Sequence, residues 1–100
     1  MSAPIRIAEP ASAEFQEAVR WYESKRTGLG REFFDAIAAT ITDIQARPDS
    51  GNAPFPDRNT RRFIVSRFPY QVVYRTGRKE ILILAIAHLK RRPGHWKHRS

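Results

Sequence analysis

The segment Ile81-Leu82-Ile83-Leu84-Ala85-Ile86-Ala87 is apolar at every position. A continuous apolar run of this length is typical of a central strand that is covered on both faces, or of a strand that pairs at an oligomer interface. A helix is the weaker interpretation, because the run is short and a turn at Gly77 to Glu80 precedes it. The run is also far too short to span a bilayer, so we expect no membrane association.

Two more strands are predicted just before this run. Residues 61–66 and 70–76 are rich in the β-branched and aromatic side chains that strands favour, and residues 67–69 predict the turn between them. Near the N-terminus, residues 5–7 alternate apolar and basic side chains, which predicts a short first strand.

Two amphipathic helices are predicted between the first strand and the second. Residues 10–26 and 29–47 carry apolar side chains at helical spacing. Thr27-Gly28 separates the two segments, and Pro48 prevents the second from continuing. Because the break is so short, we expect an antiparallel helical hairpin. The apolar stripes comprise Phe15, Ala18, Val19 and Tyr22 in the first helix and Phe33, Ile37, Ile41 and Ile44 in the second.

The predicted order of elements is β-α-α-β-β-β, which is an α+β fold in a single domain spanning residues 1–100. We expect the helical hairpin to pack on one face of a small, mostly antiparallel sheet. Residues 49–59 contain prolines and have no period, so they predict a surface loop. Residues 89–100 hold five Lys or Arg, two His and no acid, and they predict a basic C-terminal tail.

Basic residues are concentrated in the second half of the chain. Twelve of the 18 Lys and Arg lie from Arg58 onward, whereas only one of the 10 acids, Glu80, lies there. The remaining six basic and nine acidic residues leave residues 1–57 at a net charge of −3, and residues 58–100 carry +11. A separation this sharp points to an anionic partner, either nucleic acid or an acidic protein segment. The chain has no cysteine, so disulfides and thiolate metal sites are excluded, and we expect a cytoplasmic protein.

Four short motifs resemble one family. They are Trp21-Tyr22-Glu23, the strand Tyr70-x-Val72-Val73-Tyr74-Arg75, Ala85-Ile86-Ala87-His88, and the ending Arg91-Arg92-Pro93-Gly94-His95-Trp96. With the order of elements, they resemble the RelE/ParE superfamily of bacterial type II toxins over nearly the whole chain, and the ending looks more like the ParE-like branch. The resemblance implies a small cytoplasmic toxin of a plasmid stabilisation system, which a cognate antitoxin wraps and silences.

The superfamily divides by target, and more than one target stays open. ParE-like members inhibit DNA gyrase, whereas RelE-like members cut messenger RNA at the ribosome without a metal. Arg62 and Arg91 fall where RelE-like enzymes keep basic residues, but Ile64, Gln71 and Lys97 stand in place of other expected residue types. The resemblance therefore favours a ParE-like toxin that inhibits a macromolecular target such as DNA gyrase. The alternatives are a RelE-like ribosome-dependent mRNA endoribonuclease and a non-toxic binding module of the same fold.

No catalytic residue is assigned under the ParE-like interpretation. Metal-free RNA cleavage needs a proton acceptor, a proton donor and cations around the phosphate. For that alternative the chain offers Arg62, Arg75, Arg91 and His95. We expect no cofactor, and no metal site either, because no cysteine or carboxylate cluster accompanies the histidines. His88, which follows the apolar run, is expected either to bond a neighbouring backbone carbonyl or to fix the start of the tail, and in the ribonuclease alternative it could also transfer a proton.

A positively charged surface is the candidate contact with the target. Because side chains alternate along a strand, Arg62 and Arg75 are expected on the open side of the sheet, away from the helices. Such a face beside a basic tail would bind phosphates or acidic side chains. The candidate target-binding residues are Arg61, Arg62, Arg75, Lys90, Arg91, Arg92, His95 and Trp96.

The two tryptophans have different expected roles. Trp21 lies at the edge of an apolar stripe and is expected to pack at the rim of the core; the alternative is that it belongs to a partner-binding groove. Trp96 has no apolar neighbour in sequence, so either it anchors a protein interface or the tail folds back and buries its ring. The expected partners are the cognate antitoxin and DNA gyrase, or the ribosome and mRNA in the alternative. A homodimer and a toxin–antitoxin hetero-oligomer both remain open.

Overall fold

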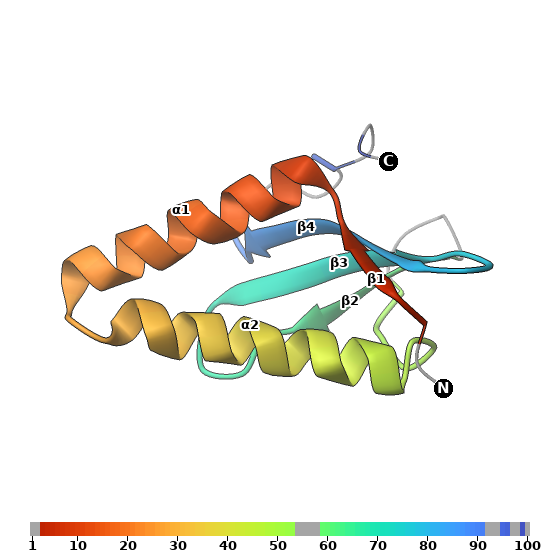
Figure 1. The fold of residues 1–100 in the computed structure, drawn as a ribbon, viewed down its shortest axis with the longest axis horizontal. Helices are drawn as coiled ribbons and strands as arrows, with labels where there is room; N and C mark the ends of the chain where they lie inside the picture. Colours follow the sequence, from red (N-terminus) through yellow and green to blue (C-terminus); the bar gives the residue numbers. More distant parts are fainter. Residues whose placement is uncertain (1–2, 54–58, 92–94, 97–98, 100) are drawn as a thin grey trace.

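The computed structural model describes residues 3–53, 59–91, 95, 96 and 99 of the chain. Its elements follow one another as β1 (Ile5–Ile7), α1 (Glu9–Lys25), α2 (Leu29–Ala46), β2 (Thr60–Ile64), β3 (Tyr70–Thr76) and β4 (Ile81–His88). The two helices lie antiparallel over one face of the sheet (Figure 1). The predicted β-α-α-β-β-β order, the α+β class and the helical hairpin are therefore confirmed.

β4 is an inner strand of the four-stranded sheet. The strand order is β1-β4-β3-β2, in which β1 runs parallel to β4 and the other neighbours are antiparallel. Every residue from Ile81 to Ala87 is at most 7% exposed. Apolar side chains on both faces of a strand are stable only where both faces are covered. The apolar run is thus the buried central strand that the sequence predicts.

β2 ends earlier than the sequence predicts. The strand spans Thr60–Ile64 instead of residues 61–66. Arg67 has a φ of 73°, in the left-handed region that residues other than glycine rarely adopt. The chain reverses there, and Val65 N–H donates to the Tyr70 carbonyl at 2.9 Å. The turn therefore includes residues that their composition assigned to the strand.

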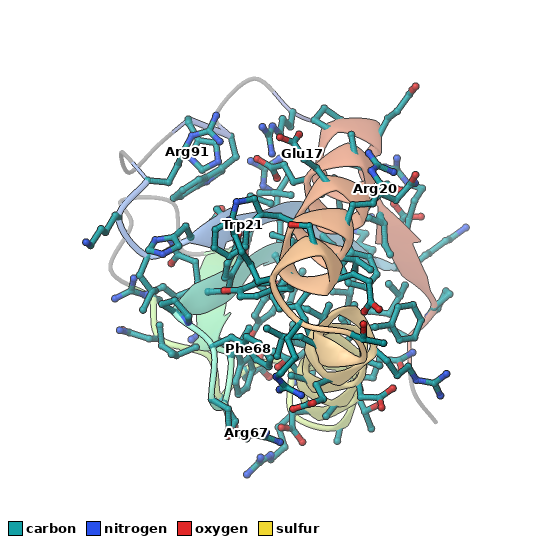
Figure 2. The ribbon with its side chains drawn as sticks, turned by 90° about the vertical axis from the view of Figure 1, so that its left-hand side faces the viewer. Glu17, Arg20, Trp21, Arg67, Phe68 and Arg91 are labelled. Carbon is teal, nitrogen blue, oxygen red and sulfur yellow. The ribbon has the colours of Figure 1, made fainter. Side chains whose placement is uncertain are left out.

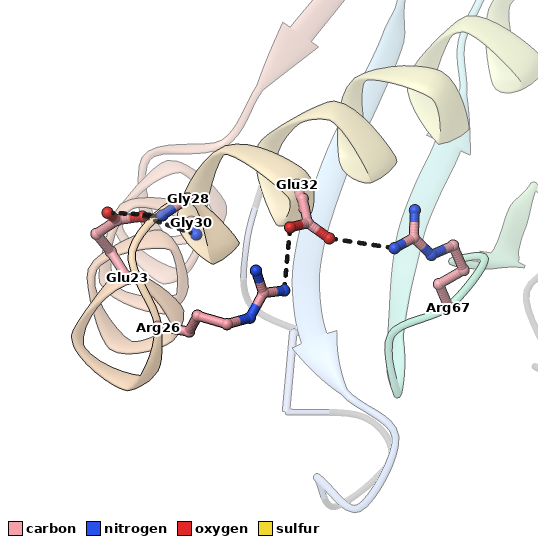
Figure 3. Close-up of polar contacts among 6 residues, drawn as sticks. All are labelled: Glu23, Arg26, Gly28, Gly30, Glu32 and Arg67. Carbon is pink, nitrogen blue, oxygen red and sulfur yellow. Dashed lines mark hydrogen bonds and ion pairs between the residues drawn. The ribbon is translucent and has the colours of Figure 1, made fainter.

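Glu23 fixes the connection between the two helices. Gly28 has a φ of 91°, which glycine adopts without steric cost. The backbone N–H groups of Gly28 and Gly30 donate to the Glu23 carboxylate at 3.0–3.1 Å (Figure 3). A carboxylate is stabilising at the start of α2, because the first N–H groups of a helix lack helical partners and the helix dipole is positive there.

Aromatic rings fill the space between the hairpin and the sheet. Phe33 of α2 is fully buried, and its ring centroid lies 4.9 Å from those of Tyr22 and Tyr70 and 5.2 Å from that of Phe68. The cluster thereby joins α1, α2, β3 and the turn before β3. Large buried aromatic side chains dominate the energetics of a small core. Among the described residues, no helix is long and apolar enough to cross a membrane.

Candidate functional site

A groove runs between α1 and the end of the sheet where β4 finishes. It has a volume of about 510 Å³. α1 contributes side chains at positions i, i+3, i+4 and i+7, which lie on one face of a helix. Figure 2 shows Trp21 on the side of α1 that faces Arg91, whereas Arg20 lies on the opposite side. The groove is lined by Glu14, Glu17, Ala18, Trp21, Tyr22, Pro69, Tyr70, Ile86, Ala87, His88 and Arg91.

Trp21 is an exposed aromatic residue in this groove. Its exposed fraction is 55%, so the expectation that it packs at the rim of the core is wrong. The ring touches Tyr22 edge-on, with centroids 5.0 Å apart, and the Lys25 ammonium lies 4.9 Å from the ring centre. A large aromatic side chain that is held in place yet exposed is suited to anchor a partner protein. The only sequence signal for this role was its position beside the apolar stripe.

Tyr70 and His88 form the floor of the groove at the β4 end. Burial raises the pKa of Tyr70, and the neighbouring Tyr22, Glu17 and Glu14 raise it further. The Tyr70 phenol is therefore a neutral hydrogen-bond donor near physiological pH. The His88 ring lies 5.4 Å from the Tyr70 ring, and His88 Nδ1 accepts a hydrogen bond from the Lys90 N–H at 3.0 Å. His88 thus fixes the start of the tail, as its place in the sequence predicts.

Glu14 holds the C-terminal tail against α1 and β4. Its side chain is 16% exposed and accepts two hydrogen bonds from Arg99, at 2.8 and 3.1 Å. His95 Nε2 lies 3.5 Å and Arg91 Nη1 lies 3.7 Å from the same carboxylate. Glu14 was not among the site residues that the sequence predicted. The excess of cations in the tail was the only sign that an acid elsewhere would neutralise part of it.

The tail residues differ in their exposure. Trp96 is 4% exposed and belongs to the hydrophobic core, so the interpretation in which the tail folds back is the one observed. The side chain of His95 is 11% exposed, and that of Arg91 is 54% exposed. Lys90 is exposed as well. Arg92 lies outside the described residues. The accessible cations of this segment are therefore Lys90 and Arg91 among the residues that the structure describes.

The arginines of β2 and β3 lie elsewhere. Arg62 Nη1 donates to Gln71 Oε1 at 3.0 Å, and Arg61 Nη1 donates to the Gly51 carbonyl at 3.0 Å. The register pairs Arg62 with Val73, so Arg62 and Arg75 share one face, as predicted. The expectation that this face is open is wrong, since Val73 is fully buried and Gln71 is 4% exposed. Other parts of the chain cover it, and both Arg62 and Arg75 are partly buried.

The candidate ribonuclease residues do not gather at one point. Arg75 is paired with Leu82, near the start of β4, whereas Arg91 follows His88 at its end. A strand rises about 3.3 Å per residue, so Leu82 and His88 are about 20 Å apart. Arg91 and His95 converge on Glu14 instead. These four candidate residues therefore form two groups, one on β2 and β3 and one beside Glu14.

These features define the class of the protein: a small α+β domain with a mixed-charge groove and a clamped basic tail. A family model described as the ParE toxin of the type II toxin-antitoxin system, parDE, matches residues 5–93. Because the match spans most of the chain, the chain belongs to this family and is a ParE-like toxin. The resemblance to the ParE-like branch is thus confirmed, and family membership implies a cognate antitoxin as partner.

Solved structures show the same fold. The chromosomal ParDE TA system from P. aeruginosa contains a chain that is similar to this one with a TM-score of 0.69 and 18% sequence identity. The match covers 87% of this chain and 96% of that chain. At this identity the likeness is evidence for the fold alone. No curated protein matches this chain significantly.

Proposed function

We propose that this ParE-like toxin inhibits DNA gyrase by binding to it, without breaking a bond itself. The observation that carries the proposal is the separation of the cations. Arg62 and Arg75 lie on β2 and β3, whereas Arg91 and His95 lie beside Glu14, at the outer edge of β4. An enzyme that cleaves RNA needs these groups around one phosphate, within hydrogen-bond distance of the reacting atoms. A binding protein has no such requirement.

We propose that the groove beside α1 receives the antitoxin. Three properties support this assignment: the groove is about 510 Å³ in volume, it exposes Trp21, and Arg91 lines it. An exposed aromatic anchor next to a cation suits a partner segment that carries apolar and acidic side chains. Lys90, which follows β4 and is exposed, adds positive charge nearby.

Pulse-labelling of new DNA and new protein after induction of this chain alone in a bacterium tests the target. We expect DNA synthesis to fail first, and the purified chain to inhibit supercoiling by gyrase. Earlier failure of protein synthesis, with cleavage of mRNA on ribosomes, would replace gyrase inhibition by the endoribonuclease function. If neither synthesis falls, the chain is a non-toxic binding module.

A charge reversal at the end of the groove tests the contact with the target. We expect Lys90→Glu to weaken gyrase inhibition, because an exposed cation favours association with an anionic surface. Lys79→Glu is the matched control, since Lys79 is equally exposed in the turn between β3 and β4, at the other end of the sheet. Equal loss of inhibition in both variants would mean that only the net charge matters and not this surface.

A further inference from the structure

The outer edge of β2 is open at Ile64. β2 is an outermost strand of the sheet, and Arg62 exchanges two backbone hydrogen bonds with Asn52, at 2.8 and 2.9 Å. Backbone groups two residues apart on a strand point the same way, so the N–H and C=O of Ile64 also point outward. Nothing in the described part of the chain bonds to them. Unpaired groups on a strand edge are a template for pairing with another chain.

Ile64 borders a hollow between β2 and α2. It is 51% exposed, whereas Gln71, its partner on β3, is 4% exposed. Ala36 and Ala39 of α2 have short side chains and leave a hollow of about 350 Å³. The edge and the hollow together offer a partner both backbone hydrogen bonds and an apolar contact. The lining residues from the strand side are Ile64, Ser66 and Arg67.

The wall that α2 contributes is acidic. It carries Glu32, Asp35 and Asp43. Glu32 is bonded by Arg26 at 3.0 Å and by Arg67 at 3.1 Å (Figure 3). The Asp43 carboxylate forms no ion pair with any side chain in the described ranges. Asp35 is bonded by Arg31 at 3.0 Å, so Asp43 is the one acid of this wall that no cation of the described residues neutralises, and its carboxylate attracts a cation.

We propose that this surface binds an extended, basic segment of another protein, which adds to β2 as a strand at Ile64 and places a Lys or Arg side chain against Asp43. Strand addition supplies affinity through main-chain hydrogen bonds, and the pockets for alternate side chains supply specificity. A second copy of this chain fits less well. Two-fold pairing of the β2 edges would bring two acidic walls together, and like charges repel.

The probe for this surface is a short synthetic peptide in which lysine and valine alternate. Added to isotope-labelled protein, it is expected to shift the NMR amide signals of Ile64, Ser66 and Asp43, with an affinity that falls as salt is added. The matched peptide with glutamate in place of lysine is expected not to bind there. Three results would overturn the proposal: shifts centred on Trp21 and His88, equal binding of the glutamate peptide, or no binding.

Two variants locate the contact. Asp43→Asn is expected to weaken lysine-peptide binding about two- to fivefold, the range of an exposed ion pair. Asp49→Asn, an exposed carboxylate in the loop after α2, is the matched control and is expected to bind as the parent does. Ile64→Lys is expected to abolish binding, because it places a cation on the strand to which the lysine-rich peptide would add. Equal effects of Asp43→Asn and Asp49→Asn would contradict the assignment.

Sedimentation of the unliganded protein distinguishes the occupants. The proposal expects a monomer. A dimer that Ile64→Lys dissociates would identify a second copy of this chain as the occupant and would overturn the basic partner. Because Ile64 and Asp43 are both exposed, the variants are expected to stay folded, which circular dichroism checks.

Discussion

Two stretches of strand edge in this sheet differ in whether their outward backbone groups have partners within the described residues. Beyond the end of β1, the edge of β4 is closed by side chains: Ile86 N–H donates to Glu14 Oε1 at 3.2 Å, and Arg99 Nη1 donates to the Leu84 carbonyl at 3.0 Å. At the other side of the sheet, Ile64 of β2 has no partner on its outer edge within the described residues. One edge is sealed by an ion pair, and the other is left for water or for a partner.

The difference follows from burial. Leu84 and Ile86 are at most 1% exposed, so their backbone groups cannot reach water and need a partner inside the protein. The bidentate Glu14–Arg99 pair supplies one donor and one acceptor at the positions that a longer β1 would otherwise fill. Ile64 is half exposed, so this part of the strand is accessible to water in the free protein. A strand edge is thus closed from within only where the fold buries it.

Removal of Glu14 tests the sealed edge and is expected to have the largest effect. Glu14→Ala leaves Arg99 and the Ile86 N–H without their acceptor in a largely buried place, which costs about 3 kcal/mol of the free energy of unfolding. Urea denaturation measures the loss. Glu80→Ala is the control, because Glu80 pairs with Arg6 at 2.7 Å with its side chain 40% exposed, and such a pair contributes less than about 1 kcal/mol. Similar losses would mean that the two acids have equivalent surroundings.

Trp21 tests the groove beside the sealed edge. We expect Trp21→Ala to weaken antitoxin binding by about 2 kcal/mol, or about 30-fold, because a buried aromatic anchor dominates an interface. The free energy of unfolding should change by less than about 1 kcal/mol, since the side chain is already exposed in the free protein. Phe34→Ala is the control, because Phe34 is 45% exposed on α2 outside the groove. If Trp21→Ala and Phe34→Ala weakened antitoxin binding equally, the assignment of the antitoxin to this groove would be wrong.

Alkaline pH tests the partly buried Tyr70 phenol that lines the groove. Burial and nearby negative groups raise the pKa of Tyr70 above its ordinary value of 10.0, so folding favours the neutral form. Its contribution to stability is complete below about pH 10 and is lost as the pH rises through the folded-state pKa, by at most about 1.4 kcal/mol per pH unit. Burial also raises the pKa values of Tyr22 and Tyr74, so these two tyrosines contribute to the same loss of stability at alkaline pH. In urea denaturation series at increasing pH, Tyr70→Phe should make the fall in the free energy of unfolding shallower. An unchanged dependence of that free energy on pH would contradict this.

Ile64 tests the open edge and is expected to have the smallest effect on stability. Ile64→Thr should change the free energy of unfolding by no more than about 0.5 kcal/mol, as is usual for exposed positions. Hydrogen exchange should distinguish neighbours on the same strand: the Arg62 amide, bonded to Asn52, is expected to exchange slowly, and the Ile64 amide quickly. Strong protection of the Ile64 amide in the free protein would show that this edge is closed after all.

The fold was predictable because its signals are local. The seven apolar residues from Ile81 to Ala87 specify a strand covered on both faces, and the strand lies between β1 and β3. The apolar stripes and the break at Thr27-Gly28 specify the helical hairpin in the same way. The end of β2 was mispredicted because residues 65 and 66 have strand-like neighbours, while the left-handed Arg67 decides where the chain turns.

The site was predicted less well, because its contacts join distant parts of the chain. Trp21 sits in an amphipathic helix and is 55% exposed, whereas Trp96 sits in a polar tail and is 4% exposed. Sequence neighbours therefore indicated the wrong environment for the first and left two choices for the second. In the sequence, Glu14 is one more acid on a predicted helix surface. In the structure, Arg99, which is 85 residues away, donates a hydrogen bond to it.

The sequence by itself determined the order of the elements, the central strand and the separation of charge along the chain. Each depends on side chains only a few positions apart, through the repeat of a helix or a strand. The tertiary structure alone decided which face of the sheet is covered, which cations stay exposed and which strand edge is closed. Those outcomes depend on how helices and tail pack over the sheet, and a buried backbone group has to find its partner in whatever segment the packing brings to it.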